Sequence, residues 1–271
     1  MTLAVDISSL NKVFNAGRSN QVDALTDVDL QVTAGEFVSL IGPSGCGKST
    51  LLRLIADLLD PTAGSIAVNG KTSRQARLDQ DYGMAFQQAG LFEWRSVAKN
   101  IELPLELKGW DKAKRHARAV EMLELVKLPD RADAMPWQLS GGQQQRIAIA
   151  RALAAHPSIL LMDEPFGALD EMTREHMQAE LLRICGATQT TVVFVTHSIP
   201  EAVYLSDRVV VMSAGPGRIT SVIPIAMNRS RDESTREAKG FYDKITEVRE
   251  ALRGSEVGAG DGLGVKGIET R

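Results

Sequence analysis

Polar and apolar residues alternate over residues 3–41, which is the pattern of half-buried β-strands. The alternation is clearest in Val5–Ser8 and, over a longer span, in Ala24–Val32. After a turn at Thr33–Gly35, the short apolar run Glu36–Ile41 predicts another strand. The same reasoning predicts a helix over Leu51–Leu58 and short strands over Ser65–Gly70 and Tyr82–Phe86.

From Val97 to about Lys127 the apolar residues recur at helical spacing instead. The charges between Asp111 and Arg118 predict a solvated helix face. A further helix is predicted from Gly142 to about His156. Because this helical stretch separates two parts of an α/β pattern, we predict an inserted helical subdomain at about residues 90–157.

Strands and helices alternate again after this insertion, which predicts an α/β fold with a mostly parallel sheet. The fully apolar run Ile159–Met162 is typical of a buried parallel strand. The remaining predicted elements are a helix over Met172–Cys185, a strand over Thr191–Val195, a helix over Pro200–Leu205, a strand over Val209–Met212 and a helix from Glu233 to about Leu252. We therefore expect one domain over residues 1–252 and a glycine-rich, disordered tail over residues 253–271.

Composition narrows the class of protein. The chain has 44% hydrophobic and 24% charged residues, as ordinary globular proteins do, and a formal net charge of −3. This acidic balance argues against a general nucleic-acid-binding surface. Two cysteines predict no disulfide framework, and no apolar run approaches the roughly 18 to 20 residues that span a bilayer. Met1–Asp6 shows no signal-peptide pattern, so a role at a membrane would require another chain to hold this one there.

The strongest motif lies between a predicted strand and a predicted helix. It reads Gly42-Pro43-Ser44-Gly45-Cys46-Gly47-Lys48-Ser49-Thr50, which is the pattern of a phosphate-binding P-loop. Glycines let backbone N–H groups approach a phosphate, Lys48 adds a positive charge, and the Ser49 hydroxyl suits Mg²⁺. The four defining positions would arise by chance in about one chain of this length in a hundred, so we predict nucleotide binding.

A second motif, Leu139–Arg146, places two consecutive glycines at the start of a predicted helix. Bare backbone at a helix N-terminus could bind an anion. Ser140 is equally suited to be a simple helix cap, which needs no function. The motif by itself leaves both interpretations open.

A third motif, Ile159–Pro165, ends an apolar strand in two acids. Carboxylates at the carboxyl edge of a sheet lie where open α/β folds bind ligands. Asp163 would hold Mg²⁺, and Glu164 would orient and deprotonate an attacking water. The alternative is a pair of exposed strand-end acids without function.

In this order and spacing, the three motifs resemble those of the nucleotide-binding subunits of ABC transporters, over about Leu3 to Leu252. The resemblance implies a P-loop NTPase core with an N-terminal antiparallel β-subdomain and an inserted helical subdomain. It also implies ATP hydrolysis with ATP and Mg²⁺ as cofactors, and a head-to-tail homodimer. The P-loop of one copy, with its catalytic Lys48, and Ser140–Gln143 of the other would enclose each ATP.

The same resemblance implies roles for further residues. Gln87 would sense Mg²⁺ and the γ-phosphate, and His197 would contact the γ-phosphate as the switch histidine. Asp170 would face the dimer partner, and Phe14 would stack on adenine. Taken alone, Gln87 and His197 are ordinary surface residues, Asp170 belongs to a plain turn and helix start, and Phe14 is a candidate core residue.

Three stretches resemble the importer ATPases for nitrate, taurine and sulfonates: Gly90–Val97, Asn100–Leu105 and Phe166–Arg174. That branch often has proline at Glu93 and aspartate at Ser198. The resemblance implies a permease docking near Gln87–Trp94, an indirect link to an extracytoplasmic solute-binding protein, and a peripheral location on the cytoplasmic face of the cell membrane.

The expected docking patch consists of Leu91, Phe92 and Trp94, whose alternative role is local packing of the helical subdomain. Other functions also stay open at this point. An exporter or lipid-handling ATPase would carry the same cassette. A non-transport ABC ATPase acting on nucleic acid or ribosomes fits less well, because the chain has one cassette and an acidic balance. A P-loop kinase or GTPase would leave Leu139–Arg146 unexplained.

Overall fold

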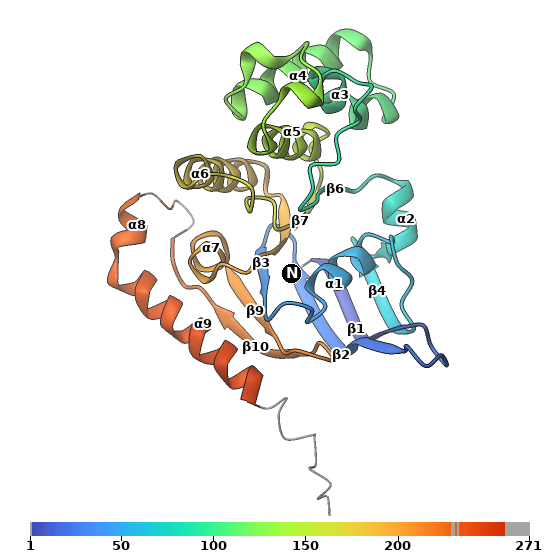
Figure 1. Ribbon diagram of the computed structural model, residues 1–271, viewed down its shortest axis with the longest axis vertical. Helices are drawn as coiled ribbons and strands as arrows, with labels where there is room; N and C mark the ends of the chain where they lie inside the picture. The colour runs from blue at the N-terminus through green and yellow to red at the C-terminus, as the bar shows by residue number, and fades with distance from the viewer. Residues whose placement is uncertain (1, 229–230, 232, 258–271) are drawn as a thin grey trace, which may run out of the picture.

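The computed structural model describes residues 2–228, 231 and 233–257, and their strands form two sheets (Figure 1). The N-terminal sheet is antiparallel, with the spatial order β2-β1-β4-β5. Its strands are β1 (Leu3–Phe14), β2 (Val22–Thr33), β4 (Ala63–Val68) and β5 (Lys71–Thr72). This sheet confirms the β-rich N-terminal part that the alternating pattern predicts.

The second sheet has the order β10-β9-β3-β8-β7-β6, and all its pairings except β10 with β9 are parallel. Its strands are β3 (Phe37–Ile41), β6 (Tyr82–Ala85), β7 (Ile159–Asp163), β8 (Thr191–Val195), β9 (Arg208–Met212) and β10 (Ile219–Pro224). The predicted mostly parallel α/β core is therefore confirmed.

Both faces of the parallel sheet are covered, because successive side chains of a strand point to opposite faces. Val193 and Val195 of β8 pack with helix α1 (Lys48–Ile55) and the N-terminal sheet. Val192 and Phe194 of the same strand pack in the other core, with helices α6 (Glu171–Thr188) and α7 (Ile199–Leu205).

Three helices lie together between β6 and β7, at the top of Figure 1. They are α3 (Val97–Leu107), α4 (Lys112–Leu125) and α5 (Gly141–Ala154), and the 3-10 turns Pro129–Arg131 and Pro136–Gln138 connect α4 to α5. The helical stretch expected from Val97 to about Lys127 is thus two helices. Gly109 interrupts it with a left-handed φ of 73°, and Asp111 caps the second helix by accepting a hydrogen bond from the N–H of Lys114 at 3.0 Å.

Several boundaries differ from the predictions. Helix α1 begins at Lys48 rather than Leu51, because the last residues of the P-loop motif form its first turn. The predicted C-terminal helix is two helices, α8 (Glu233–Glu237) and α9 (Lys239–Val257). Helix α9 thus passes the expected boundary at residue 252, and residues 258–271 of the expected tail lie outside the described residues. Strand β10 and the short helix α2 (Ser73–Leu78) were not predicted.

Within the part of the chain that the structure describes, no helix has the length and apolarity needed to span a membrane.

Candidate functional site

The P-loop motif lies where β3 ends and α1 begins, at the carboxyl edge of the parallel sheet (Figure 1). Gly45 and Gly47 have φ values of 78° and 93°, which other residues rarely adopt. A Cβ on Gly47 would lie 2.6 Å from Leu25 Cδ2 and 2.9 Å from the carbonyl oxygen of Ala24. The N-cap residue of α1 is Gly47, which has no side chain to cap the first turn. The N–H groups of this turn are therefore suited to bind an anion.

Lys48 is the first residue of α1, and only 7% of it is exposed. Its ammonium donates hydrogen bonds to the carbonyl oxygens of Gly42 and Pro43, at 2.8 and 2.9 Å. The loop thus holds a full positive charge against its own main chain. An anionic group bound to the loop would meet this charge and the N–H groups of α1 together.

Ser49 and Asp163 join α1 to the end of β7. The Ser49 hydroxyl donates a 2.8 Å hydrogen bond to Asp163 Oδ1. Burial raises the pKa of the Asp163 carboxyl above its ordinary value, and the bond from Ser49 acts in the opposite direction. Both residues line a cavity of about 410 Å³ that Gln87 also lines. Hydroxyl, carboxylate and amide oxygens are ligands that Mg²⁺ accepts.

Among the described residues, no cluster of three or more His, Cys, Asp or Glu side chains could hold a metal by itself. Mg²⁺ is usually bound through one or two carboxylates and substrate phosphates, so one carboxylate such as Asp163 would be enough to hold it. The residues present at Ser49 and Asp163 therefore fit the ion that the motifs predict.

The structure brings three further predicted residues together around one carboxylate oxygen. Glu164 Oε2 lies 3.3 Å from Gln87 Nε2 and 3.2 Å from His197 Nδ1. Gln87 follows β6, Glu164 follows β7 and His197 follows β8, and these strands are neighbours with parallel pairing. Parallel strands end at the same edge of a sheet, so residues more than a hundred positions apart in the chain meet there.

The backbone of Glu164 has a φ of 46°, in the left-handed region. Such a conformation costs about 1–3 kcal/mol in a residue other than glycine and is frequent at functional sites. The N–H of Glu164 donates to the carbonyl oxygen of Val195 at 2.9 Å, which ties the turn to β8. The Glu164 carboxylate thus stands on a turn with a costly backbone conformation that is anchored to β8.

The second motif begins helix α5 as a capping box. Ser140 Oγ accepts from the N–H of Gln143 at 3.3 Å, and Gln143 Oε1 accepts from the N–H of Ser140 at 3.0 Å. The capping interpretation of Ser140 is therefore correct. A Cβ on Gly141 would meet no atom within 4 Å, so the backbone there is open to an approaching group. Among the described residues, those that line the cavity beside Ser49 include none from Ser140–Gln143.

Asp170 and Phe14 are not among the described residues that contact the Glu164 carboxylate or line the cavity beside Ser49. Asp170 caps α6, where its Oδ1 accepts from the N–H of Thr173 at 2.9 Å. This hydrogen bond lowers the pKa of the Asp170 carboxyl below its ordinary value. The Phe14 ring is half-buried at the end of β1, with the Lys12 ammonium 5.0 Å from its centroid. Phe14 is therefore not one of the core residues that the sequence alone suggested.

Two residues of α5 that the sequence did not single out hold the segment around Gln87. Gln145 is buried and donates from Nε2 to the carbonyl oxygen of Phe86 at 2.8 Å. Arg151 donates to the carbonyl oxygens of Ala89 and Gly90, both at 2.9 Å. The helix that starts with the second motif is thus bonded to the segment that carries Gln87. Because the donors and acceptors are about sixty positions apart in the chain, no local sequence signal could reveal these bonds.

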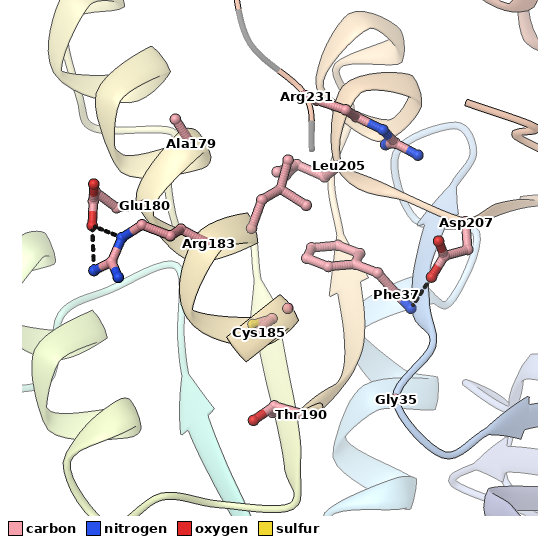
Figure 2. A pocket seen from close by; sticks show the side chains of 12 residues that line it. Gly35, Phe37, Ala179, Glu180, Arg183, Cys185, Thr190, Leu205, Asp207 and Arg231 are labelled. Carbon is pink, nitrogen blue, oxygen red and sulfur yellow. Dashed lines mark hydrogen bonds and ion pairs between the residues drawn. The ribbon is translucent and has the colours of Figure 1, made fainter. Parts of the chain in front are cut away.

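Another cavity, of about 570 Å³, lies at the amino edge of the same sheet, where β3, β8 and β9 begin (Figure 2). Phe37, Leu205 and Cys185 contribute apolar walls. The N–H of Phe37 donates to Asp207 Oδ2 at 2.8 Å, and Arg183 pairs with Glu180 at 2.9 Å, as the dashed lines in Figure 2 show. The residues that the structure describes around this cavity include none of the predicted site residues.

Comparison with known proteins agrees with the motifs. The family model described as ABC transporter matches residues 25–167. The chain is 42% identical to the nitrate import ATP-binding protein of Synechocystis sp., over 93% of this chain and 96% of the relative. It is 41% identical to the aliphatic sulfonates import ATP-binding protein of Bacillus subtilis, over 96% of this chain and 100% of the relative.

A solved structure also resembles the protein. It is a dimeric post-hydrolysis state of an ATP-binding cassette bound to ADP and Pi, with a TM-score of 0.76 and 35% sequence identity, covering 83% of this chain and 100% of that chain. The resemblance inferred from the motifs and the ABC ATPase fold are thus confirmed. The chain belongs to the ABC transporter family and is one of its ATP-binding proteins, which are ATPases coupled to transport.

Proposed function

We propose that this protein hydrolyses ATP to energise the uptake of a small solute of the nitrate, taurine or sulfonate class. The observation that carries the proposal is the convergence of Gln87 and His197 on Glu164, beside Ser49 and Asp163. The relatives that are named for nitrate and aliphatic sulfonate import support the solute class and the direction of transport. An exporter with the same cassette is the second candidate, and no observation favours it.

Within this proposal the P-loop holds the triphosphate. The N–H groups of α1 and the Lys48 ammonium bind the β- and γ-phosphates, while the Phe14 ring stacks on adenine. Ser49, Asp163 and Gln87 hold Mg²⁺, which supplies positive charge against the phosphate oxygens. These groups come from α1, from the ends of β1 and β7 and from the segment after β6, so the bound substrate would link these elements together.

Glu164 is the proposed general base. It accepts a proton from the water that attacks the γ-phosphorus, while Gln87 and His197 hold its carboxylate in place. His197 is 71% exposed, so its imidazole can also reach the γ-phosphate. A carboxylate held by two partners is oriented before the substrate arrives, which lowers the cost of aligning it during the reaction.

A second copy of the chain completes the site in this proposal. Ser140, Gly141, Gly142 and Gln143 of one copy close over the γ-phosphate on the P-loop of the other, and Asp170 lies at the interface. The open backbone at Gly141 and the dimeric state of the similar cassette structure support this proposed dimer. Two-fold symmetry then gives two equivalent ATP sites.

The permease subunit would dock near Gln87–Trp94, and the solute-binding protein would be reached only through it. Trp94 is 74% exposed, and its ring lies 5.0 Å from that of Phe92. Leu91 instead is partly buried and packs against the core that contains the inserted helices, α6 and α7. Local packing therefore accounts for the apolar side chain of Leu91. Asn100 fixes the loop, because its side chain bonds both the N–H and the carbonyl oxygen of Phe92. This docking would keep the protein at the cytoplasmic face of the cell membrane.

The proposal is tested by uptake in cells that lack the chain. Wild-type protein should restore uptake of labelled nitrate, taurine or an alkanesulfonate, whereas Lys48→Ala should not. Lys71→Ala is the matched control, because Lys71 pairs with Asp79 and Asp81 at the surface. Net efflux of the label, or equal uptake by wild type and Lys48→Ala, would contradict the proposal.

A further inference from the structure

A network of buried, hydrogen-bonded polar side chains packs under the loop that carries His197. Its centre is Glu201 on α7, of which only 7% is exposed. Glu201 Oε1 accepts a 2.8 Å hydrogen bond from Gln178 Nε2 of α6, and Oε2 accepts one from the Thr196 hydroxyl. Gln178 and Thr196 are each 2% exposed. A buried carboxylate is costly, so its presence here needs a reason.

Two donors at the ends of this hydrogen-bond network determine the direction of each hydrogen bond within it. Thr196 Oγ1 accepts from the N–H of Ser198 at 3.0 Å, and this backbone group can only donate. At the other end, the Arg236 guanidinium of α8 donates to Gln178 Oε1 at 2.6 Å, and it too can only donate.

Gln178 therefore presents its NH₂ group to Glu201, and Thr196 presents its hydroxyl hydrogen. All donors converge on Glu201, which must accept on both oxygens. A carboxylate does this and an amide of the same shape cannot.

This hydrogen-bond network holds the two residues on either side of His197. Thr196 is bonded directly to Glu201, and Ser198 is bonded to Thr196 and to the N–H of Glu201, the latter at 3.4 Å. The His197 side chain, by contrast, is largely exposed and lies 3.2 Å from Glu164. The position of the imidazole therefore depends on the main chain that Glu201 fixes from below.

We propose that Glu201 is a positioning residue for ATP hydrolysis, which holds the 196–198 loop so that His197 reaches Glu164 and the γ-phosphate. Gln178 and Arg236 keep the carboxylate of Glu201 in its accepting arrangement, so helix α8 is coupled to the site. This inference rests on the proposed roles of His197 and Glu164. Helices α6, α7 and α8 lie next to one another in Figure 1, in agreement with the hydrogen bonds of Gln178 to Glu201 and to Arg236.

Burial and hydrogen bonding have opposing effects on the pKa of the Glu201 carboxyl. Burial raises the pKa of Glu201 above its ordinary value, whereas the hydrogen bonds from Thr196 and Gln178 and the charge of Arg174 act in the opposite direction. Arg236 is itself held in place, with its guanidinium carbon 3.7 Å from the centroid of the Tyr204 ring and Nε 3.7 Å from Glu175 Oε1.

The test exchanges the two ends of one hydrogen bond. Glu201→Gln places an NH₂ group against a donor and should lower kcat by about ten- to a hundredfold, with the KM for ATP changed less than about twofold. In Gln178→Glu/Glu201→Gln, the carboxylate introduced at position 178 accepts from Arg236 and from the amide introduced at position 201. The oxygen of that amide is then free to accept from Thr196 again. This double variant has the same net charge as wild type, and it should recover most of kcat.

A second pair of variants covers the case in which Glu201→Gln fails to fold. Thr196→Val removes the hydroxyl and should lower kcat, whereas Thr196→Ser keeps it and should not. Thermal unfolding of every variant separates lost stability from lost turnover. Wild-type kcat in folded Glu201→Gln or Thr196→Val, or a double variant as slow as the single one, would overturn the inference.

The result is also distinguishable from failure of the proposed function. If His197→Ala hydrolyses ATP at the wild-type rate, the proposed role of His197 fails and the inference fails with it. If His197→Ala is slow but Glu201→Gln is not, only the inference fails. If Glu201 acts through His197, the combined variant His197→Ala/Glu201→Gln should be no slower than His197→Ala.

Discussion

The two edges of the parallel sheet differ in how their polar side chains are paired. At the carboxyl edge, Glu164 has two partners that follow separate strands, and Ser49 is hydrogen-bonded to Asp163 beside a cavity that both residues line. At the amino edge, Arg183 and Glu180 pair within one helix turn beside an apolar wall. The edges differ because β3, β6, β7 and β8 end at the carboxyl edge, where α1 also begins. A cavity is therefore a poor guide to chemistry unless polar groups from several elements converge on it.

The largest expected effect tests this difference with matched substitutions. Glu164→Gln should lower kcat by about 10²- to 10⁴-fold, because a general base contributes that much to a rate. Affinity for ATP should persist, since Glu164 lies beside the phosphates rather than on the P-loop, and an ATP-bound dimer should accumulate in size-exclusion chromatography. Glu180→Gln, at the amino edge, is the control and should hydrolyse ATP at the wild-type rate. Normal turnover by Glu164→Gln would remove this residue from the role of base.

The next effect concerns binding rather than turnover. Lys48→Ala should weaken ATP binding by about ten- to a hundredfold, because a hydrogen bond to a charged group is worth about 1.5–3 kcal/mol. Isothermal titration calorimetry with non-hydrolysed nucleotide measures this directly. Lys71→Ala removes a lysine outside the site and should bind as wild type does. Equal affinity of Lys48→Ala and wild type would count against the P-loop assignment.

At the carboxyl edge, the segment that follows β6 contains Gln87 and then the exposed ring of Trp94. Replacing Phe92 and Trp94 together by alanine should weaken binding of the permease by about thirtyfold or more, the effect of losing an interface residue worth about 2 kcal/mol. ATP hydrolysis by the isolated chain should be unchanged. Co-purification with the permease at the wild-type ratio would show that the permease binds elsewhere.

Much of the carboxyl edge could be predicted from the sequence, because its signals are local. The P-loop spacing needs no knowledge of the fold, and the apolar run Ile159–Met162 identifies β7 almost to its ends. What the sequence missed depends on contacts between distant positions. Glu201 of α7 and Gln178 of α6 meet only in the folded chain, and so do Gln145 of α5 and the carbonyl oxygen of Phe86. Strand β10 was missed because it lies at the border of the sheet, where Ile223 is the one buried residue of Ile219–Pro224, so the strand lacks the apolar run of a central strand.

The smallest expected effect lies at the amino edge and completes the comparison. Arg183 is 63% exposed, and its pair with Glu180 spans one helix turn, so Arg183→Ala should lower the free energy of unfolding by less than about 1 kcal/mol. The kcat and the KM for ATP should not change, because the pair touches no residue of the nucleotide site. Chemical denaturation and steady-state hydrolysis measure the two quantities separately. A tenfold fall in kcat without loss of stability would mean that the amino edge takes part in the reaction, and the contrast between the edges would then fail.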